Sequence, residues 1–190
     1  MTAPNIMILA GSIRGGSLSA KLAAAADAQF RKLDCHAERI FLADFEMPIY
    51  NGDLEAASGI PDGVERLAKE FLRFQGFFIV TPEYNQSLPP LLKNSIDWLS
   101  RIRGDLQAAY RDKAFAIASI SPGQFGGTRA IIDLRRVLVS AFNAIVIPDQ
   151  ISLPAANAAF SPTGQLLQEA KQLQLQEVCS KLVRISGLKM

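Results

Sequence analysis

A polar loop at residues 81–85, TPEYN, carries the side chains best suited to hold a flat ligand. The ring of Tyr84 could pack beside a heterocycle, while backbone amides and the side-chain amide of Asn85 meet its polar edges. The carboxylate of Glu83 could face the ligand or pair with an arginine across a subunit interface, so we assign it no acid or base role. The alternative is a proline turn whose Asn85 caps the next helix.

A second loop, GSIRGGS at residues 11–17, is typical of a phosphate site. It lies between a predicted strand and the amino end of a predicted helix, where amide donors converge and the helix dipole favours an anion. The hydroxyl groups of Ser12, Ser17 and Ser19 could donate to phosphate oxygens, and Arg14 could add a charge-assisted contact. The loop matches neither GxxxxGK[ST] nor GxGxxG. A serine cap with glycines for turning is the alternative interpretation.

The elements that must position these loops alternate along the chain. The run at 77–80 is apolar without interruption, as expected of a strand buried on both faces of a sheet. Strict alternation predicts a flavodoxin-like three-layer α/β/α sandwich, with a five-stranded parallel sheet of order 2-1-3-4-5 in a single domain over residues 1–190. We expect strands at 5–10, 38–42, 77–80, 114–120 and 144–147, and helices at 18–33, 64–74, 88–102, 128–142 and 164–185.

A third loop, SPGQFGG at residues 121–127, again follows a predicted strand and opens a predicted helix. Its glycines permit close approach of the backbone to a ligand. In a sheet of order 2-1-3-4-5, the loops after strands one, three and four surround the point where the strand order reverses, and folds of this type hold FMN there. The three loops therefore predict one ligand site.

Composition excludes several classes of protein. The chain has 190 residues and a net charge of +2, with no basic stripe typical of nucleic-acid binding. No apolar stretch approaches the roughly 20 residues that cross a bilayer, and the amino terminus lacks the pattern of a signal peptide, so we expect a cytoplasmic protein that binds no membrane. Cys35 and Cys179 are expected to be free thiols. The single histidine, His36, argues against a metal site or a histidine-dependent triad.

On these motifs the chain resembles the NADPH-dependent FMN reductase family, a flavodoxin-like group that includes chromate and quinone reductases and some azoreductases. The segments that carry the resemblance are GSIRGGSLS at 11–19, MPIYNGD at 47–53, TPEYNQSLPPLLKNSIDWLSR at 81–101 and SPGQFGGTRA at 121–130. The resemblance implies that Ser12, Arg14, Ser17 and Ser19 bind the FMN phosphate, that Pro82, Glu83, Tyr84 and Asn85 line the isoalloxazine, and that Ser121, Gly123 and Gly126 complete the pocket.

Two positions depart from the family pattern. Gln86 stands where many members have glycine, and Gly15 with Gly16 replaces a bulkier, often basic residue. These departures leave the expected FMN binding intact and leave the choice between NADPH and NADH open. The turn at 47–53 is expected near the pocket edge or a subunit contact.

The implied function is that of an NAD(P)H-dependent FMN reductase or quinone reductase. Hydride would pass from NAD(P)H through bound FMN to quinones, azo compounds, chromate or free flavin by a ping-pong mechanism, with no catalytic side chain required. A flavodoxin-like electron carrier, or an FMN-binding redox regulator without nicotinamide turnover, is the alternative on the same fold. The balanced charge disfavours the carrier, which would usually be strongly acidic near its flavin.

The predicted helix at 88–102 has an unusually wide apolar surface. Its apolar residues form two adjacent stripes, wider than one sheet contact needs, and the excess suggests a subunit interface. Because members of the resembling family are at least dimers, we expect a homodimer or homotetramer. The alternative is that Trp98 packs against loops of its own chain.

Overall fold

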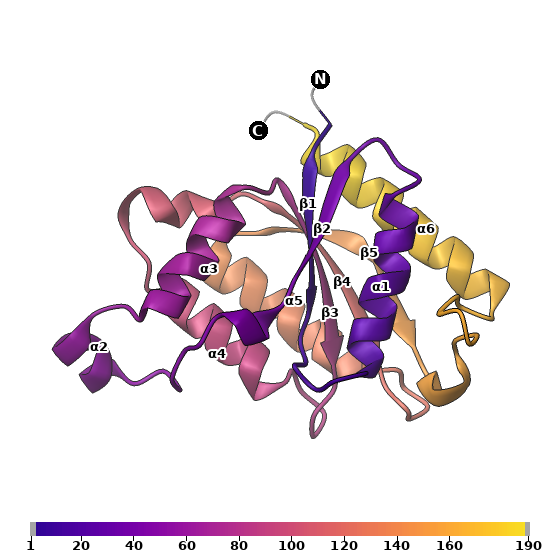
Figure 1. The fold of residues 1–190 in the computed structure, drawn as a ribbon, viewed down its shortest axis with the longest axis horizontal. Coiled ribbons are helices and arrows are strands. Elements are labelled where there is room, and N and C mark those ends of the chain that lie inside the picture. Colours follow the sequence, from indigo (N-terminus) through magenta and orange to yellow (C-terminus); the bar gives the residue numbers. More distant parts are fainter. Residues whose placement is uncertain (1–2, 189–190) are drawn as a thin grey trace.

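The computed structural model describes residues 3–188, and these form a sandwich around one parallel sheet (Figure 1). The strand order is β2-β1-β3-β4-β5, and every neighbouring pair is parallel. This confirms the predicted order and the flavodoxin-like class. The strands are β1 (Asn5–Ala10), β2 (His36–Ile40), β3 (Gly76–Pro82), β4 (Ala114–Ile120) and β5 (Ile145–Leu153).

Helices cover both faces of the sheet (Figure 1). On one face lie α1 (Leu18–Phe30) and α6 (Glu169–Ser186), and on the other lie α3 (Asp62–Leu72), α4 (Pro90–Leu99) and α5 (Thr128–Phe142). A short helix that the sequence analysis missed, α2 (Gly52–Ser58), lies at the periphery and has no buried residue. Because α2 has so little apolar surface, its sequence lacks the helical repeat of apolar residues that predicts a helix.

The two cores follow from the alternation of side chains along each strand. Phe77 of β3 points into the core beneath α3, α4 and α5, whereas its neighbour Phe78 points into the core beneath α1 and α6. The ring of Phe77 stacks between Phe71 and Phe115, with centroid separations of 4.8 and 4.6 Å. Burial on both faces explains why the central strands read as uninterrupted apolar runs.

The last strand is longer than predicted. The sequence predicts a strand at 144–147, but β5 runs from Ile145 to Leu153. The register shifts between Phe115 and Ile117 of β4, so that the β5 residues around Pro148 bulge out of the ladder. Because β5 is an edge strand, a proline at such an irregularity costs few hydrogen bonds. The misplaced boundary follows from reading Pro148 as a strand end.

Both apolar stripes of α4 pack against other parts of the same chain. Trp98 is fully buried, and its indole N–H donates to the carbonyl of Pro48 at 2.7 Å. Asn94 accepts from the amide of Tyr50 at 2.8 Å and donates to Pro48 at 2.9 Å. The turn at 47–53 therefore docks on α4, as the alternative interpretation of Trp98 expected. The width of α4 no longer argues for a subunit interface, and the oligomeric state stays a prediction.

Ionisable groups reinforce this docking. The hydroxyl of Tyr50 donates to Glu55 of α2 at 2.9 Å, which raises the pKa of Tyr50. Arg101 donates to both oxygens of Glu55 at 3.0 and 2.9 Å, and this contact lowers the pKa of Glu55. The cluster ties α2 to the end of α4.

Two further expectations concern composition. Cys35 and Cys179 are both free thiols, and burial raises the pKa of each. Within residues 3–188, none of the helices combines the length and apolar character that a bilayer crossing requires.

Candidate functional site

The loops that follow β1, β3 and β4 enclose a cavity of about 190 Å³, here called the rim cavity. It brings together most of the predicted site residues, namely Ser12, Arg14, Ser17, Ser19, Pro82, Glu83, Tyr84 and Ser121. Leu18, Ile120 and Pro122 also line it, although the sequence analysis did not single them out. Their position directly beside predicted site residues was the only available signal. Asn85, Gly123 and Gly126 are not among the lining residues.

The amino end of α1 opens on this cavity without an anion of its own. Ser17 is the N-cap, and its hydroxyl accepts from the amide of Ala20 at 3.2 Å and shares a hydrogen bond with the hydroxyl of Ser19 at 3.2 Å. Both serines are buried, and no acidic residue lies in the first turn. The amides of Leu18 and Ser19 have no carbonyl partner within the helix. The first turn therefore offers free donors and a positive dipole end.

Arg14 adds a full positive charge to the same place. Its side chain is exposed at the rim, and among residues 3–188 no carboxylate forms an ion pair with it. The backbone amide of Arg14 donates to the hydroxyl of Ser12 at 3.4 Å, which turns the loop around the cavity. An unpaired guanidinium beside free amides is the arrangement that binds a phosphate group.

The amino end of α5 lies on the same rim but is closed by Glu83. Its N-cap, Gly127, has no side chain to cap the helix. Instead, the carboxylate of Glu83 accepts from the amides of Arg129 at 3.0 Å and Ala130 at 3.3 Å, and lies 3.7 Å from the Arg129 guanidinium. Glu83 thus lines the cavity, as one of the two expectations had it, and it pairs with an arginine of its own chain instead of one across a subunit interface.

The turn after Glu83 is a tight hairpin. The amide of Tyr84 donates to the carbonyl of Ser87 at 3.0 Å and the amide of Ser87 returns a bond at 3.1 Å, while Asn85 and Gln86 have φ of 48° and 69°. Two successive positive φ values are typical of a type I′ turn. The alternative in which Asn85 caps the next helix is wrong, because α4 begins at Pro90 with Pro89 as its N-cap. Tyr84 is left half exposed at the cavity mouth.

The loop at 121–127 is packed against the sheet edge. A Cβ placed on Gly126, which has φ of 61°, would lie 2.5 Å from the Ser152 hydroxyl oxygen, 2.8 Å from Pro154 N and 2.9 Å from Leu153 C. The carbonyl of Gly123 accepts from Ala155 at 3.2 Å. Gly126 therefore lacks a side chain because β5 leaves no room for one, and its place is behind the cavity wall.

A second hollow of about 560 Å³, the outer groove, shares the loop at 11–17 with the rim cavity. Its lining is mostly apolar and includes Ile13, Leu42, Phe45 and Leu91. Met47 and Pro48 of the turn at 47–53 line it as well, whereas no residue of this turn lines the rim cavity. The sequence predicts the turn but not the apolar groove, because the residues that line the groove come from three separate segments, at 13, 42–48 and 91.

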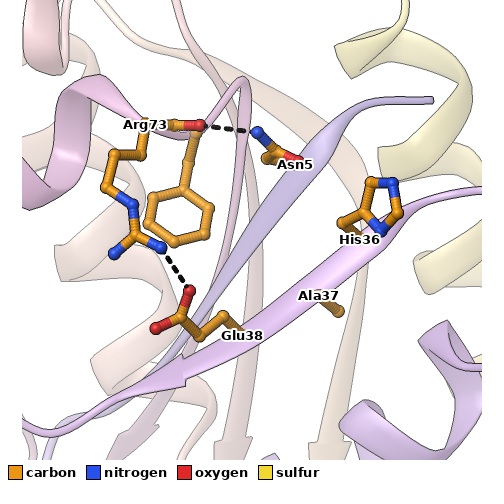
Figure 2. Close-up of a pocket in the computed structure, with 6 residues that line it drawn as sticks. Asn5, His36, Ala37, Glu38 and Arg73 are labelled. Carbon is orange, nitrogen blue, oxygen red and sulfur yellow. Dashed lines mark hydrogen bonds and ion pairs between the residues drawn. The ribbon is translucent and has the colours of Figure 1, made fainter. Parts of the chain in front are cut away.

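A third hollow lies at the opposite end of the strands and is already satisfied internally. It measures about 270 Å³ and is lined by Asn5, His36, Ala37, Glu38, Arg73 and Phe74. Figure 2 shows the guanidinium of Arg73 turned toward Glu38, at 2.7 Å, and the side chain of Asn5 donating to the Arg73 carbonyl at 3.0 Å. With its cation and amide both paired, this hollow has no free charge for a ligand.

The chain is similar to known proteins over most of its length. The NADPH-dependent FMN reductase family matches residues 4–158. A quinone reductase of Escherichia coli (strain K12) is 33% identical over 172 residues, covering 86% of this chain and 85% of the relative. An NAD(P)H-dependent FMN reductase of Pseudomonas aeruginosa is 33% identical over 187 residues, covering 96% and 97%.

Among solved structures, the flavoenzyme NAD(P)H:(acceptor) oxidoreductase of Paracoccus denitrificans is similar with a TM-score of 0.77 and 26% identity, covering 96% of this chain and 97% of that one. The family match extends from β1 into the segment that follows β5, and so includes all three loops of the rim. The chain belongs to the NADPH-dependent FMN reductase family and is an NAD(P)H-dependent oxidoreductase.

Proposed function

We propose that this chain holds FMN in the rim cavity and uses NAD(P)H to reduce quinones and related acceptors. The observation that carries the proposal is the open amino end of α1 beside the unpaired Arg14, in the same cavity as Pro82 and Tyr84. Free amides and a guanidinium suit the phosphate of FMN, because hydrogen bonds to a charged group are stronger than neutral ones. The residues present therefore fit this cofactor.

The phosphate would be held by the guanidinium of Arg14, the hydroxyl of Ser12 and the first-turn amides of Leu18 and Ser19. The hydroxyls of Ser17 and Ser19 already bond to each other, so their part is to fix the first turn. Pro82 and Tyr84 would flank the ring, and Ser121 would close the third side. Asn85 and the glycines at 123 and 126 would shape the loops behind these contacts.

The protein's own part in the reaction is to bind and orient. No histidine, cysteine or lysine lines the rim cavity, and the Glu83 carboxylate in its wall already accepts from the amides of Arg129 and Ala130. FMN, when bound, would supply the redox chemistry, namely ping-pong hydride transfer from NAD(P)H to an acceptor. Such a ping-pong order needs a mouth wide enough for successive substrates, and the exposed Tyr84 lies at that mouth.

The outer groove supports a preference for flat apolar acceptors. Its apolar lining beside the loop at 11–17 suits a quinone ring better than a hydrated anion. Relatives described as quinone reductase and as 2-hydroxy-1,4-benzoquinone reductase favour the same substrate class. Azo compounds, chromate and free flavin are further candidate acceptors.

We also propose a homodimer or homotetramer that works in the cytoplasm. Ile13 and Ile49 are 61% and 74% exposed, and a second subunit would cover such side chains. Free thiols suit a reducing compartment. Light scattering on the purified protein measures the oligomeric state, and a monomer would contradict the assembly without touching the proposed chemistry.

Rapid mixing with NADPH and with NADH tests the function. The protein with FMN bound should lose its visible flavin absorbance within the dead time or in a saturable phase, and added quinone should restore it. An electron carrier would bind FMN but keep its colour with both nicotinamides, and that result would contradict the proposal. A steady-state screen of quinones, azo dyes, chromate and free FMN then ranks the acceptors.

A further inference from the structure

Two of the helices that begin on the rim, α1 and α5, each offer an anion site of similar chemistry. The first has the amides of Leu18 and Ser19 with the guanidinium of Arg14 nearby. The second has the amides of Arg129 and Ala130, with the guanidinium of Arg129 itself. We propose that Glu83 is a positioning residue that occupies the second site and so confines the cofactor phosphate to the first. This inference rests on the proposed binding of FMN in the rim cavity.

The contacts of Glu83 are those of an anion bound at a helix terminus. One carboxylate oxygen accepts from two successive amides, at 3.0 and 3.3 Å, and the other lies 3.7 Å from the guanidinium of Arg129. The side chain is only 13% exposed. A carboxylate with two amide donors and a cation in a partly buried position is held firmly in one place.

Glu83 stands between α5 and the cavity. It belongs to the loop that follows β3, and it lines the cavity together with Pro82 and Tyr84. The Arg129 guanidinium is further restrained by the ring of Phe125, whose centroid lies 4.8 Å away. Removing the carboxylate would leave two amides, a helix dipole and a guanidinium facing the space beside the ring wall.

This arrangement determines the orientation of the bound cofactor. With α5 closed, the free helix terminus that lines the rim cavity is that of α1. A phosphate bound there places the ring toward Pro82 and Tyr84. With α5 open, a phosphate could bind at either end, and part of the bound flavin would be turned or displaced. Glu83 would therefore act through its neighbours and not by touching the reacting atoms.

The variants Glu83→Ala and Glu83→Gln separate the two properties of this side chain. Alanine opens α5, whereas glutamine keeps an oxygen that accepts from the same amides and loses only the charge. Glu65→Ala is the matched control, since Glu65 is a half-exposed carboxylate on α3, paired with Lys69 and remote from the rim. Each protein is prepared with FMN added and titrated with inorganic phosphate while the amide signals of Arg129 and Ala130 are followed by NMR.

We expect phosphate to shift these two amide signals in Glu83→Ala and to leave them unchanged in the wild type and in Glu65→Ala. In Glu83→Gln the apparent affinity for phosphate should be about fivefold weaker than in Glu83→Ala, because phosphate must displace the hydrogen bond that the neutral glutamine oxygen makes to the amides. Visible circular dichroism of bound FMN should fall in Glu83→Ala and return toward the wild-type value in Glu83→Gln.

Unshifted Arg129 and Ala130 amides in a folded Glu83→Ala protein would overturn the inference. So would a flavin dichroism spectrum in Glu83→Ala that matches the wild type. If none of the proteins bound FMN, the proposed function would fail, but the phosphate titration would still decide whether Glu83 closes α5. The two failures are therefore distinguishable.

Discussion

The glycine-rich loops at 11–17 and 121–127 occupy equivalent places in the fold and are built in different ways. Each follows a central strand and opens a helix at the same rim. Around Gly15, no atom lies within 4 Å of a hypothetical Cβ, whereas around Gly126 three atoms lie within 2.9 Å. At the start of α1, after the first loop, the amide donors are free. At the start of α5, after the second loop, they donate to the carboxylate of Glu83. Similar composition therefore produces one open binding loop and one packed structural loop.

Gly126→Ala alters the packed loop, and we expect its effect, a loss of stability, to be the largest of the four. The new methyl group would meet backbone atoms of β5 and hold a residue at positive φ, which together cost about 2–4 kcal/mol. We expect the melting temperature to fall by roughly 5–15 °C. Thermal unfolding followed by circular dichroism measures it. Gly15→Ala is the control, with an expected change within about 0.5 kcal/mol; equal losses in both variants would mean that the loops do not differ.

Arg14→Met alters the open loop and should weaken the binding of FMN. Loss of one charge-assisted contact to the phosphate should weaken FMN binding by about 10- to 150-fold, equivalent to about 1.5–3 kcal/mol. Titration of the protein with FMN, followed by quenching of flavin fluorescence, gives the dissociation constant. Riboflavin lacks the phosphate, so its affinity should not change. A parallel loss for riboflavin would place Arg14 at the ring instead of the phosphate.

Ser17→Ala tests whether the Ser17 hydroxyl contributes mainly to the stability of the open loop or to its binding of FMN. The hydroxyl caps α1 by accepting from Ala20 and bonds to Ser19, so its loss should lower the free energy of unfolding by about 1 kcal/mol. The effect on FMN affinity should be smaller than that of Arg14→Met. Urea unfolding and FMN titration of the same sample compare the two effects. A binding loss with unchanged stability would show that the hydroxyl reaches the phosphate directly.

Gln86→Gly concerns the hairpin between the two loops and should have the smallest effect. Gln86 has a φ of 69°, which strains a residue with a side chain, but glycine also gains freedom in the unfolded chain. We expect a net gain of about 0.5 kcal/mol in the free energy of unfolding. Urea unfolding measures it, with Gln176→Gly on the exposed face of α6 as a control that should be destabilised. A loss at Gln86 would mean that its side chain makes contacts that outweigh the strain.

The sequence predicted those parts of the site that depend on local pattern. An uninterrupted apolar run located the buried strand β3, and the predicted parallel order then placed the three loops on one rim. It did not identify the partner of Glu83, because Arg129 lies 46 residues away and the contact exists only after the sheet has formed. It also misjudged the surface of α4, since the turn that covers Trp98 is an irregular segment from elsewhere in the chain.

The same distinction explains the errors at element boundaries. Pro148 ends a strand in most sequence patterns, yet an edge strand with an irregular register accommodates it. The positive φ of Gln86 was not predictable, because the residue type does not favour that region and the hairpin geometry imposes it. Tertiary context decided these positions, and local propensity did not.

The carboxylate that closes α5 also has a consequence for the order of folding. Gly127 supplies no local cap, so the first turn of α5 is completed by a residue of the β3 loop. That residue comes into range only when β3 and β4 have paired, with Thr81 opposite Ser119. The amide hydrogens of Arg129 and Ala130 should therefore exchange with solvent only when the central sheet opens, and α5 should unfold together with the sheet as one cooperative unit.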